Sequence, residues 1–197
     1  PTFQMFSDQM FSVKQKNVRI VHFSGHGSTK DGLLWFEDPA SAKSAMDSAK
    51  VSIHSFTQLF EPVAAGSAEG GTVECVFLNA CESETVGEGL RECGVPYVVC
   101  WRTVVQDPSA LLFARAFYTA LDHEPRNYKL AFIQATKRMQ PINCAQGSLD
   151  VVCFLSKDGP IEVHEPRNYF SKNGDVADDA DLPNHMHHLP LHLPPPA

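Results

Sequence analysis

Short apolar runs alternate with helix-forming segments along most of the chain, and this order limits the fold more than any other feature. The runs cover residues 18–23, 72–78, 95–101 and 151–155, and each is short enough to be a buried strand. Helical segments lie between most of these runs, as crossover connections between parallel strands require. The sequence therefore predicts an α/β fold, a three-layer sandwich around a mostly parallel central sheet.

Apolar residues at helical spacing mark the expected helices. The clearest segments begin near Phe3, Val86, Asp107 and Tyr128. Asp107 stands before Pro108, which predicts Asp107 as the N-cap and Pro108 as the first helical residue. The apolar face of that helix is predicted to contain Leu111, Ala114, Phe117 and Leu121.

The region between the first two runs carries weaker signals. A further short strand is expected at residues 33–36, followed by a loop or weak helix at 38–50. Ser55 and Gln58 have the spacing of a capping box, so a short helix is expected to begin there.

The periodic part of the sequence predicts one domain, residues 1–156, followed by an acidic and then Pro- and His-rich tail at 157–197. The tail has no apolar periodicity, so we expect it to be flexible. The chain begins with Pro1, which predicts excision from a longer parent and a domain that lacks part of its N-terminal side. The hexapeptide H-E-P-R-N-Y occurs at 123–128 and again at 164–169, and the sequence offers no physical reason for the copy.

Charge and composition argue against several function classes. The net charge is −7 and the 16 Lys and Arg residues are scattered, which argues against nucleic-acid binding. No apolar run approaches the roughly 18 residues of a membrane span, and no signal-peptide pattern opens the chain, so a soluble cytoplasmic protein without membrane contact is expected. The 6 cysteines include no C-x-x-C pair, which favours reduced thiols over a zinc ribbon. No cofactor or metal site is predicted, the histidines of the tail included.

Two loops that follow predicted strands carry the candidate catalytic residues. His26 lies between Gly25 and Gly27 after the first strand, and Cys81 follows the second run. In open α/β sheets such loops project side chains into a shared crevice. An imidazole that takes the thiol proton would make Cys81 a nucleophile, and the backbone N–H groups of Gly27 and Cys81 would bind the oxyanion. The neighbouring His22 lacks the glycine flanks, so we expect a buried structural histidine there.

Three segments, in this order, resemble the signature blocks of a known protease family. They are V-H-F-S-G-H-G at 21–27, V-F-L-N-A-C-E-S at 76–83 and Y-V-V-C-W-R-T-V-V-Q-D-P-S-A-L-L-F-A-R-A-F-Y at 97–118. The family is that of CHAT domains, caspase-like relatives of caspases, metacaspases and separase. The resemblance covers roughly residues 18–155 and implies the caspase-hemoglobinase fold and a cysteine endopeptidase that acts on protein or peptide substrates.

The same resemblance implies roles for individual residues. His26 matches the general base, Cys81 the nucleophile and Gly27 the oxyanion-hole glycine. Trp101 and Asp107 fall where separase-like relatives have a segment beside the primary specificity pocket, and an acidic Asp107 there would favour a basic residue before the scissile bond.

Glu82, which follows the nucleophile, is a further candidate for substrate contact, although the start of a turn explains it as well.

Two other functions stay open at this point. A domain of this fold can keep both residues yet act as a catalytically silent or partner-activated signalling or assembly module, together with a regulatory partner or with domains of the parent chain. The same thiol chemistry also serves acyl transfer or the hydrolysis of non-peptide substrates. Protease chemistry leads because all three blocks resemble a protease family.

Overall fold

The computed structural model describes residues 2–28, 33–37, 48–146, 152–157 and 159. All of them lie in the first of two units, Pro1–Glu162, and the second unit, Val163–Ala197, lies outside the described residues. The predicted tail at 157–197 therefore falls almost wholly outside what the structure describes, as does the second H-E-P-R-N-Y copy. The domain boundary at 156 stays a prediction.

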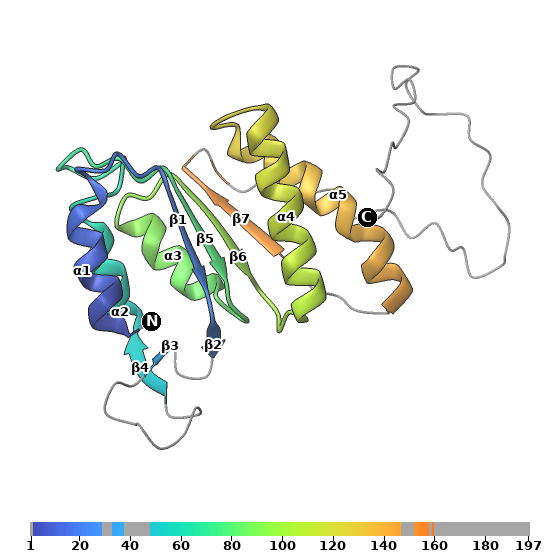
Figure 1. Cartoon of the computed structure of the whole chain (residues 1–197), viewed down its shortest axis with the longest axis horizontal. Helices are drawn as coiled ribbons and strands as arrows, with labels where there is room; N and C mark the ends of the chain where they lie inside the picture. The colour runs from blue at the N-terminus through green and yellow to red at the C-terminus, as the bar shows by residue number, and fades with distance from the viewer. Residues whose placement is uncertain (1, 29–32, 38–47, 147–151, 158, 160–197) are drawn as a thin grey trace, which may run out of the picture. The chain divides into compact units, whose positions relative to one another are not determined.

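A four-stranded central sheet organises the described part of the chain (Figure 1). Its order is β1-β5-β6-β7, with β1 at Ile20–Ser24, β5 at Cys75–Asn79, β6 at Tyr97–Trp101 and β7 at Val152–Ser156. β1, β5 and β6 are parallel, and β7 is antiparallel to β6. The prediction of a mostly parallel sheet is confirmed.

Three strands begin later than the sequence predicts, and the first of them is β1, which starts at Ile20 and not at residue 18. Val73 does not join β5, because it forms a bridge with Ala64 and accepts a hydrogen bond from the Ala65 N–H at 2.8 Å. β6 begins at Tyr97, directly after Pro96, which has no N–H to donate to a ladder.

Helices cover both faces of the central sheet, as Figure 1 shows. They are α1 Phe3–Val13, α2 Ile53–Thr57 with the 3-10 turn η1 Gln58–Phe60, and α3 Glu84–Glu92 on one face, and α4 Asp107–His123 and α5 Tyr128–Gln146 on the other. Successive strand residues point to opposite faces, so Val76 enters the first core and Phe77 enters the second. The three-layer α/β sandwich is confirmed.

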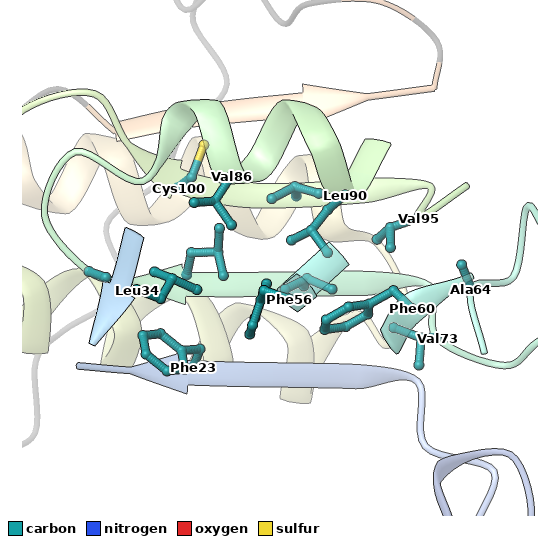
Figure 2. Packing of buried hydrophobic residues seen from close by; sticks show 14 of the residues in the cluster. Phe23, Leu34, Phe56, Phe60, Ala64, Val73, Val86, Leu90, Val95 and Cys100 are labelled. Atoms are coloured by element: carbon teal, nitrogen blue, oxygen red, sulfur yellow. The ribbon is translucent and has the colours of Figure 1, made fainter. Parts of the chain in front are cut away.

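Phe56 lies in the middle of the first core and is fully buried (Figure 2). Its ring stacks on Phe6 of α1, with 5.4 Å between ring centroids. It also contacts Phe60 of η1 at 5.3 Å and Phe23 of β1 at 5.9 Å. This core therefore joins the N-terminal helix to the strand that leads to His26.

A small antiparallel sheet, β2-β3-β4, follows β1 directly. Its strands are β2 His26–Ser28, β3 Leu33–Glu37 and β4 Ser48–Ser52. Leu34 and Phe36 are buried in the first core, which fixes this sheet to the rest of the unit. The predicted strand at 33–36 is confirmed. The predicted loop or helix at 38–50 is wrong for its last residues, because they pair with β3, and residues 38–47 lie outside the described part.

Two predicted helix caps are wrong, although α4 begins at Asp107, where the sequence predicts a helix start. Ser52 caps α2, because its Oγ accepts a hydrogen bond from the Ser55 N–H at 3.1 Å, so Ser55 and Gln58 form no capping box. The N-cap of α4 is Gln106, which makes no side-chain cap, and Asp107 is already the first helical residue. A carboxylate in the first turn still interacts favourably with the helix dipole.

Three of the four residues predicted for the buried face of α4 are buried, namely Ala114, Phe117 and Leu121, and one is not. Leu111 is 71% exposed, whereas Phe113 and Phe117 are fully buried. The helix packs against both the sheet and its neighbour α5, so the residues that reach the second core are set by both.

The Glu74 carboxylate joins the sheet to the turn between α4 and α5. Glu74 stands just before β5 and accepts hydrogen bonds from Arg19 at 2.6 Å and from Tyr128 at 2.9 Å. Arg126 donates from both Nε and Nη2 to the same carboxylate. Arg126 and Tyr128 belong to the first H-E-P-R-N-Y copy, so this copy has a structural role.

Burial opposes the charged form of Glu74, but the hydrogen bonds from Arg126 and Tyr128 and the charges of both arginines outweigh it. The pKa of Glu74 therefore lies below its ordinary value. A carboxyl group of this kind stabilises the fold above its ordinary pKa of about 4.3, and the contribution is lost as the pH falls through the lower folded value.

We expect Glu74→Gln to lower the free energy of unfolding at neutral pH, because it removes the charge that holds both arginines. The difference from the wild type should shrink at acidic pH, below about pH 4. Urea unfolding at a series of pH values measures both effects, with Glu92→Gln, at an exposed residue of α3, as the control. A difference that is independent of pH would contradict this account.

Candidate active site

β1 and β5 bring the two candidate loops to one edge of the sheet. The strands are parallel neighbours whose last residues, Ser24 and Asn79, are register partners. The Gly25 N–H extends this pairing with a hydrogen bond to the Asn79 carbonyl at 3.3 Å. His26 and Cys81 each follow two residues after that last pair. The parallel register therefore delivers both residues to the same end of adjacent strands.

Gly27 packs directly against the backbone of the Cys81 loop. A Cβ atom built on Gly27 would overlap the Cys81 carbonyl oxygen and would lie 3.5 Å from the Ala80 Cβ. A backbone carbonyl cannot move aside as a flexible side chain can, so the contact requires glycine at this position. The His26 strand and the Cys81 loop are thus in van der Waals contact.

The loop after β6 holds the Cys81 thiol. The Val105 N–H donates to the Cys81 Sγ at 3.4 Å, and the Sγ lies 3.7 Å from the Val105 carbonyl oxygen. The side chain is half-buried. An N–H donor that points at sulfur interacts more strongly as negative charge develops there.

The Cys81 backbone N–H is free of any acceptor within the described part of the chain. The next residue, Glu82, has a φ of 50°, in the left-handed region that residues other than glycine seldom adopt. The Glu82 N–H bonds the Thr103 carbonyl at 3.1 Å, which holds this conformation in place. Such backbone strain is concentrated at functional sites in proteins.

His26 is exposed at the start of β2. Trp35 is its cross-strand partner in β3, and the two rings meet edge to face with 6.3 Å between their centroids. The small sheet therefore supports the imidazole from the side of β3.

Trp101 and its partners brace the ends of β5 and β6 beneath the site. The fully buried Trp101 donates from Nε1 to the Asn79 Oδ1 at 3.1 Å. Its backbone N–H donates to the Ser83 Oγ at 3.1 Å, and that hydroxyl donates to the Leu78 carbonyl at 3.4 Å. Trp101 has no exposed surface to offer a substrate in this conformation.

Sequence reasoning does not single out Asn79, and it marks Ser83, like Glu82, only as a substrate contact or the start of a turn. Asn79 and Ser83 lie within the N-A-C-E-S segment, and a polar residue at the end of a buried strand was the available signal. Their hydrogen bonds show that the segment fixes the position of Cys81 from both sides.

Glu82 follows Cys81 directly in the sequence, and Asp107 follows the loop that contacts Cys81 in the fold. Asp107 is exposed in the first turn of α4, two residues after Val105, which contacts the Cys81 thiol. Glu82 is half-buried.

His22 is not the buried histidine that the sequence predicts. The residue is exposed on β1, although its ring stacks on Phe77 at 4.6 Å and on Tyr118 at 5.7 Å. The prediction is wrong because the side chain packs on one face only. Partial burial on that face lowers the pKa of His22.

The structure gives no metal-binding group among the described residues, where no three His, Cys, Asp or Glu side chains converge. Within the same residues, no helix has the length and apolar character needed to cross a membrane.

We expect Asn79→Ala to lower the free energy of unfolding by about 1–3 kcal/mol, because the buried indole N–H of Trp101 loses its acceptor. Trp101→Phe in the Asn79→Ala background removes the orphaned donor. The double variant should therefore lose less than the sum of the two single losses, as measured by denaturant unfolding. Additive losses would show that the hydrogen bond does not couple the two side chains.

The family model of the CHAT domain matches residues 2–189, which is nearly the whole chain. No curated protein matches the chain. The family match includes both candidate loops and the segment from β6 into α4, the three places where the sequence resembles CHAT domains. The chain therefore belongs to the CHAT domain family, which is related to the caspase-like cysteine peptidases.

Proposed function

We propose that this protein is a cysteine endopeptidase in which Cys81 is the nucleophile and His26 the general base. The observation that carries the proposal is the contact between the two loops, in which Gly27 lies against the Cys81 carbonyl at the ends of paired parallel strands. Family membership supports the same chemistry. The substrate is a protein or peptide, and the reaction needs no cofactor.

The proposed reaction has two stages. The Cys81 Sγ attacks the scissile carbonyl carbon while His26 accepts the thiol proton, and the imidazolium then donates that proton to the leaving amine. Water hydrolyses the resulting thioester and releases the Cys81 thiol. The Cys81 N–H, which has no acceptor among the described residues, is available to the oxyanion, and the Gly27 N–H is the second proposed donor.

Two acidic residues are proposed to contact the substrate. The exposed Asp107 lies in the same loop-to-helix connection that touches the Cys81 thiol, and Glu82 follows the nucleophile. Carboxylates at these positions favour a basic residue before the scissile bond. Trp101, buried beneath them, supports the loop through its hydrogen bonds.

Five cysteines in the described residues are free thiols, and we place the protein in a reducing compartment, the cytoplasm, on that ground.

A partner-activated or catalytically silent module is the second candidate. β1 pairs only with β5 among the described residues, which leaves its outer edge without a ladder there. Phe11 and Met5 of α1 are 78% and 58% exposed. Open strand edges and exposed apolar side chains are features through which a regulatory partner or other domains of a longer chain dock.

We expect acyloxymethyl ketone probes with a basic specificity residue to label Cys81, because such probes report an active thiol nucleophile. Cys81→Ala should abolish labelling and peptide hydrolysis, and His26→Ala should slow both by roughly 100- to 10,000-fold. Cys93→Ala, at a half-buried thiol at the end of α3, is the matched control and should retain both. Peptide mass spectrometry locates the adduct.

Labelling at another cysteine would contradict the assignment of Cys81. A folded wild type that neither labels nor cleaves peptides would favour the partner-activated module. Labelling without cleavage of any peptide would favour acyl transfer or a non-peptide substrate.

We also expect Gly27→Ala to slow the labelling of Cys81 strongly, because the added methyl group pushes the His26 strand away from the Cys81 carbonyl. Gly89→Ala is the matched control, since its added Cβ meets only side-chain atoms, with the Thr57 Cγ2 at 3.1 Å. The second-order labelling rate and the thermal unfolding midpoint are measured for each variant. Equal labelling rates in two equally folded variants would show that the close approach of Gly27 is not needed.

A further inference from the structure

Cys100 and Cys153 lie directly opposite each other in the antiparallel ladder between β6 and β7. Directly opposite residues in such a ladder have Cα atoms roughly 4.5 or 5.5 Å apart, depending on the type of pair. Both spacings fall within the approximate 4.4–6.8 Å range of disulfide-bonded cysteines. Both residues are free thiols, and both side chains enter the first core.

Cys153 belongs to a chain of hydrogen bonds that runs through Glu84 to Arg102. The Cys153 thiol donates to the Glu84 Oε1 at 3.5 Å, and Cys100 is the register partner of Cys153 across the ladder. Arg102 holds the Glu84 carboxylate with hydrogen bonds of 2.8 and 2.7 Å. The ladder spacing of the two Cα atoms is the observation that permits a bridge between these strands.

The two thiols differ in their environment. The neighbouring Cys100 thiol lowers the pKa of Cys153, whereas the Cys153 thiol together with burial raises the pKa of Cys100. Cys153 is 8% exposed and Cys100 is fully buried. Cys153 is thus the thiol that a small reagent reaches and the one that ionises first.

The geometry points to a modification site: we propose that Cys100 and Cys153 form an oxidisable dithiol, which a hydroperoxide converts into a disulfide across β6 and β7. The Cys153 thiolate attacks the peroxide oxygen, which breaks the O–O bond, gives the Cys153 sulfenic acid and releases an alcohol, or water from hydrogen peroxide. The Cys100 sulfur then attacks the sulfenic sulfur, and water leaves with the Cys100 proton. Two thiols are oxidised and one peroxide is reduced.

This site is separate from the proposed catalytic thiol but is connected to its loop. Cys81 contacts Val105, whereas Cys100 packs under Gly87 of α3, whose added Cβ would lie 3.0 Å from the Cys100 Sγ. Disulfide formation removes the hydrogen bond that Cys153 donates to Glu84, the first residue of α3. The loss of this hydrogen bond therefore affects the N-terminus of α3, which begins three residues after Cys81.

The test treats the full, fully reduced chain with increasing hydrogen peroxide, alkylates the remaining thiols and maps tryptic peptides without reduction. Cleavage after Arg91, Arg102, Arg138 and Lys157 leaves Cys100 in peptide 92–102 and Cys153 in peptide 139–157. These peptides also contain Cys93 and Cys144, so Cys93→Ser and Cys144→Ser are the matched controls.

We expect a cross-linked pair of these peptides, two hydrogens lighter than their sum, in the wild type, in both control variants and in Cys81→Ala. The pair should disappear in Cys153→Ser and in Cys100→Ala, and dithiothreitol should reverse it in the wild type. Circular dichroism and thermal unfolding establish that each variant is folded.

The proposal is overturned if the cross-link requires Cys93 or Cys144, or if Cys100 and Cys153 stay alkylatable at peroxide concentrations that oxidise Cys81. Oxidation of Cys153 to the sulfinic acid without any cross-link would overturn it as well.

Discussion

The pairing of β1 with β5 is the interaction on which the site depends. Parallel strands in register end at the same edge of a sheet, and here the Gly25 N–H continues the ladder onto the Asn79 carbonyl. That single register places Gly27 on the Cys81 backbone. A slip by one residue would turn every side chain of β1 to the opposite face and would remove Phe23 from the first core. Core packing and site geometry are therefore fixed by the same hydrogen bonds.

The loop after β6 completes the site from the other side of β5. Its backbone supplies the N–H that meets the Cys81 sulfur and the carbonyl that accepts from Glu82. Trp101 anchors the start of this loop, with its indole on Asn79 and its backbone on Ser83. The strained backbone conformation of Glu82 persists because its N–H is bonded to the Thr103 carbonyl. The flanking residues Cys81 and Ser83 are also held by hydrogen bonds. The buried Trp101, which the sequence predicts near the substrate, thus holds the loop that carries Cys81.

The cysteines of the described region show how far environment separates chemically identical groups. Full burial raises the pKa of Cys75, which lies between the sheet and the second helix layer. Cys81 is half-buried, with a backbone donor on its sulfur. Cys100 and Cys153 are register partners across two strands. Position in the three layers, rather than the local sequence alone, decides which of these thiols is inert, which is a nucleophile in our proposal, and which form a pair.

The sequence by itself determined the layer order, the parallel strands, the two loops with His26 and Cys81, and the family, because apolar periodicity and short glycine-flanked motifs are local properties. It did not determine the cap of α2, the exposure of Leu111 on α4, the exposure of His22 or the strand at the end of 38–50. Each of these is set by what packs against the segment from elsewhere in the chain. The contact of Gly27 with Cys81, the burial of Trp101 and the pairing of Cys100 with Cys153 join residues that are distant in sequence, so only the tertiary structure decided them.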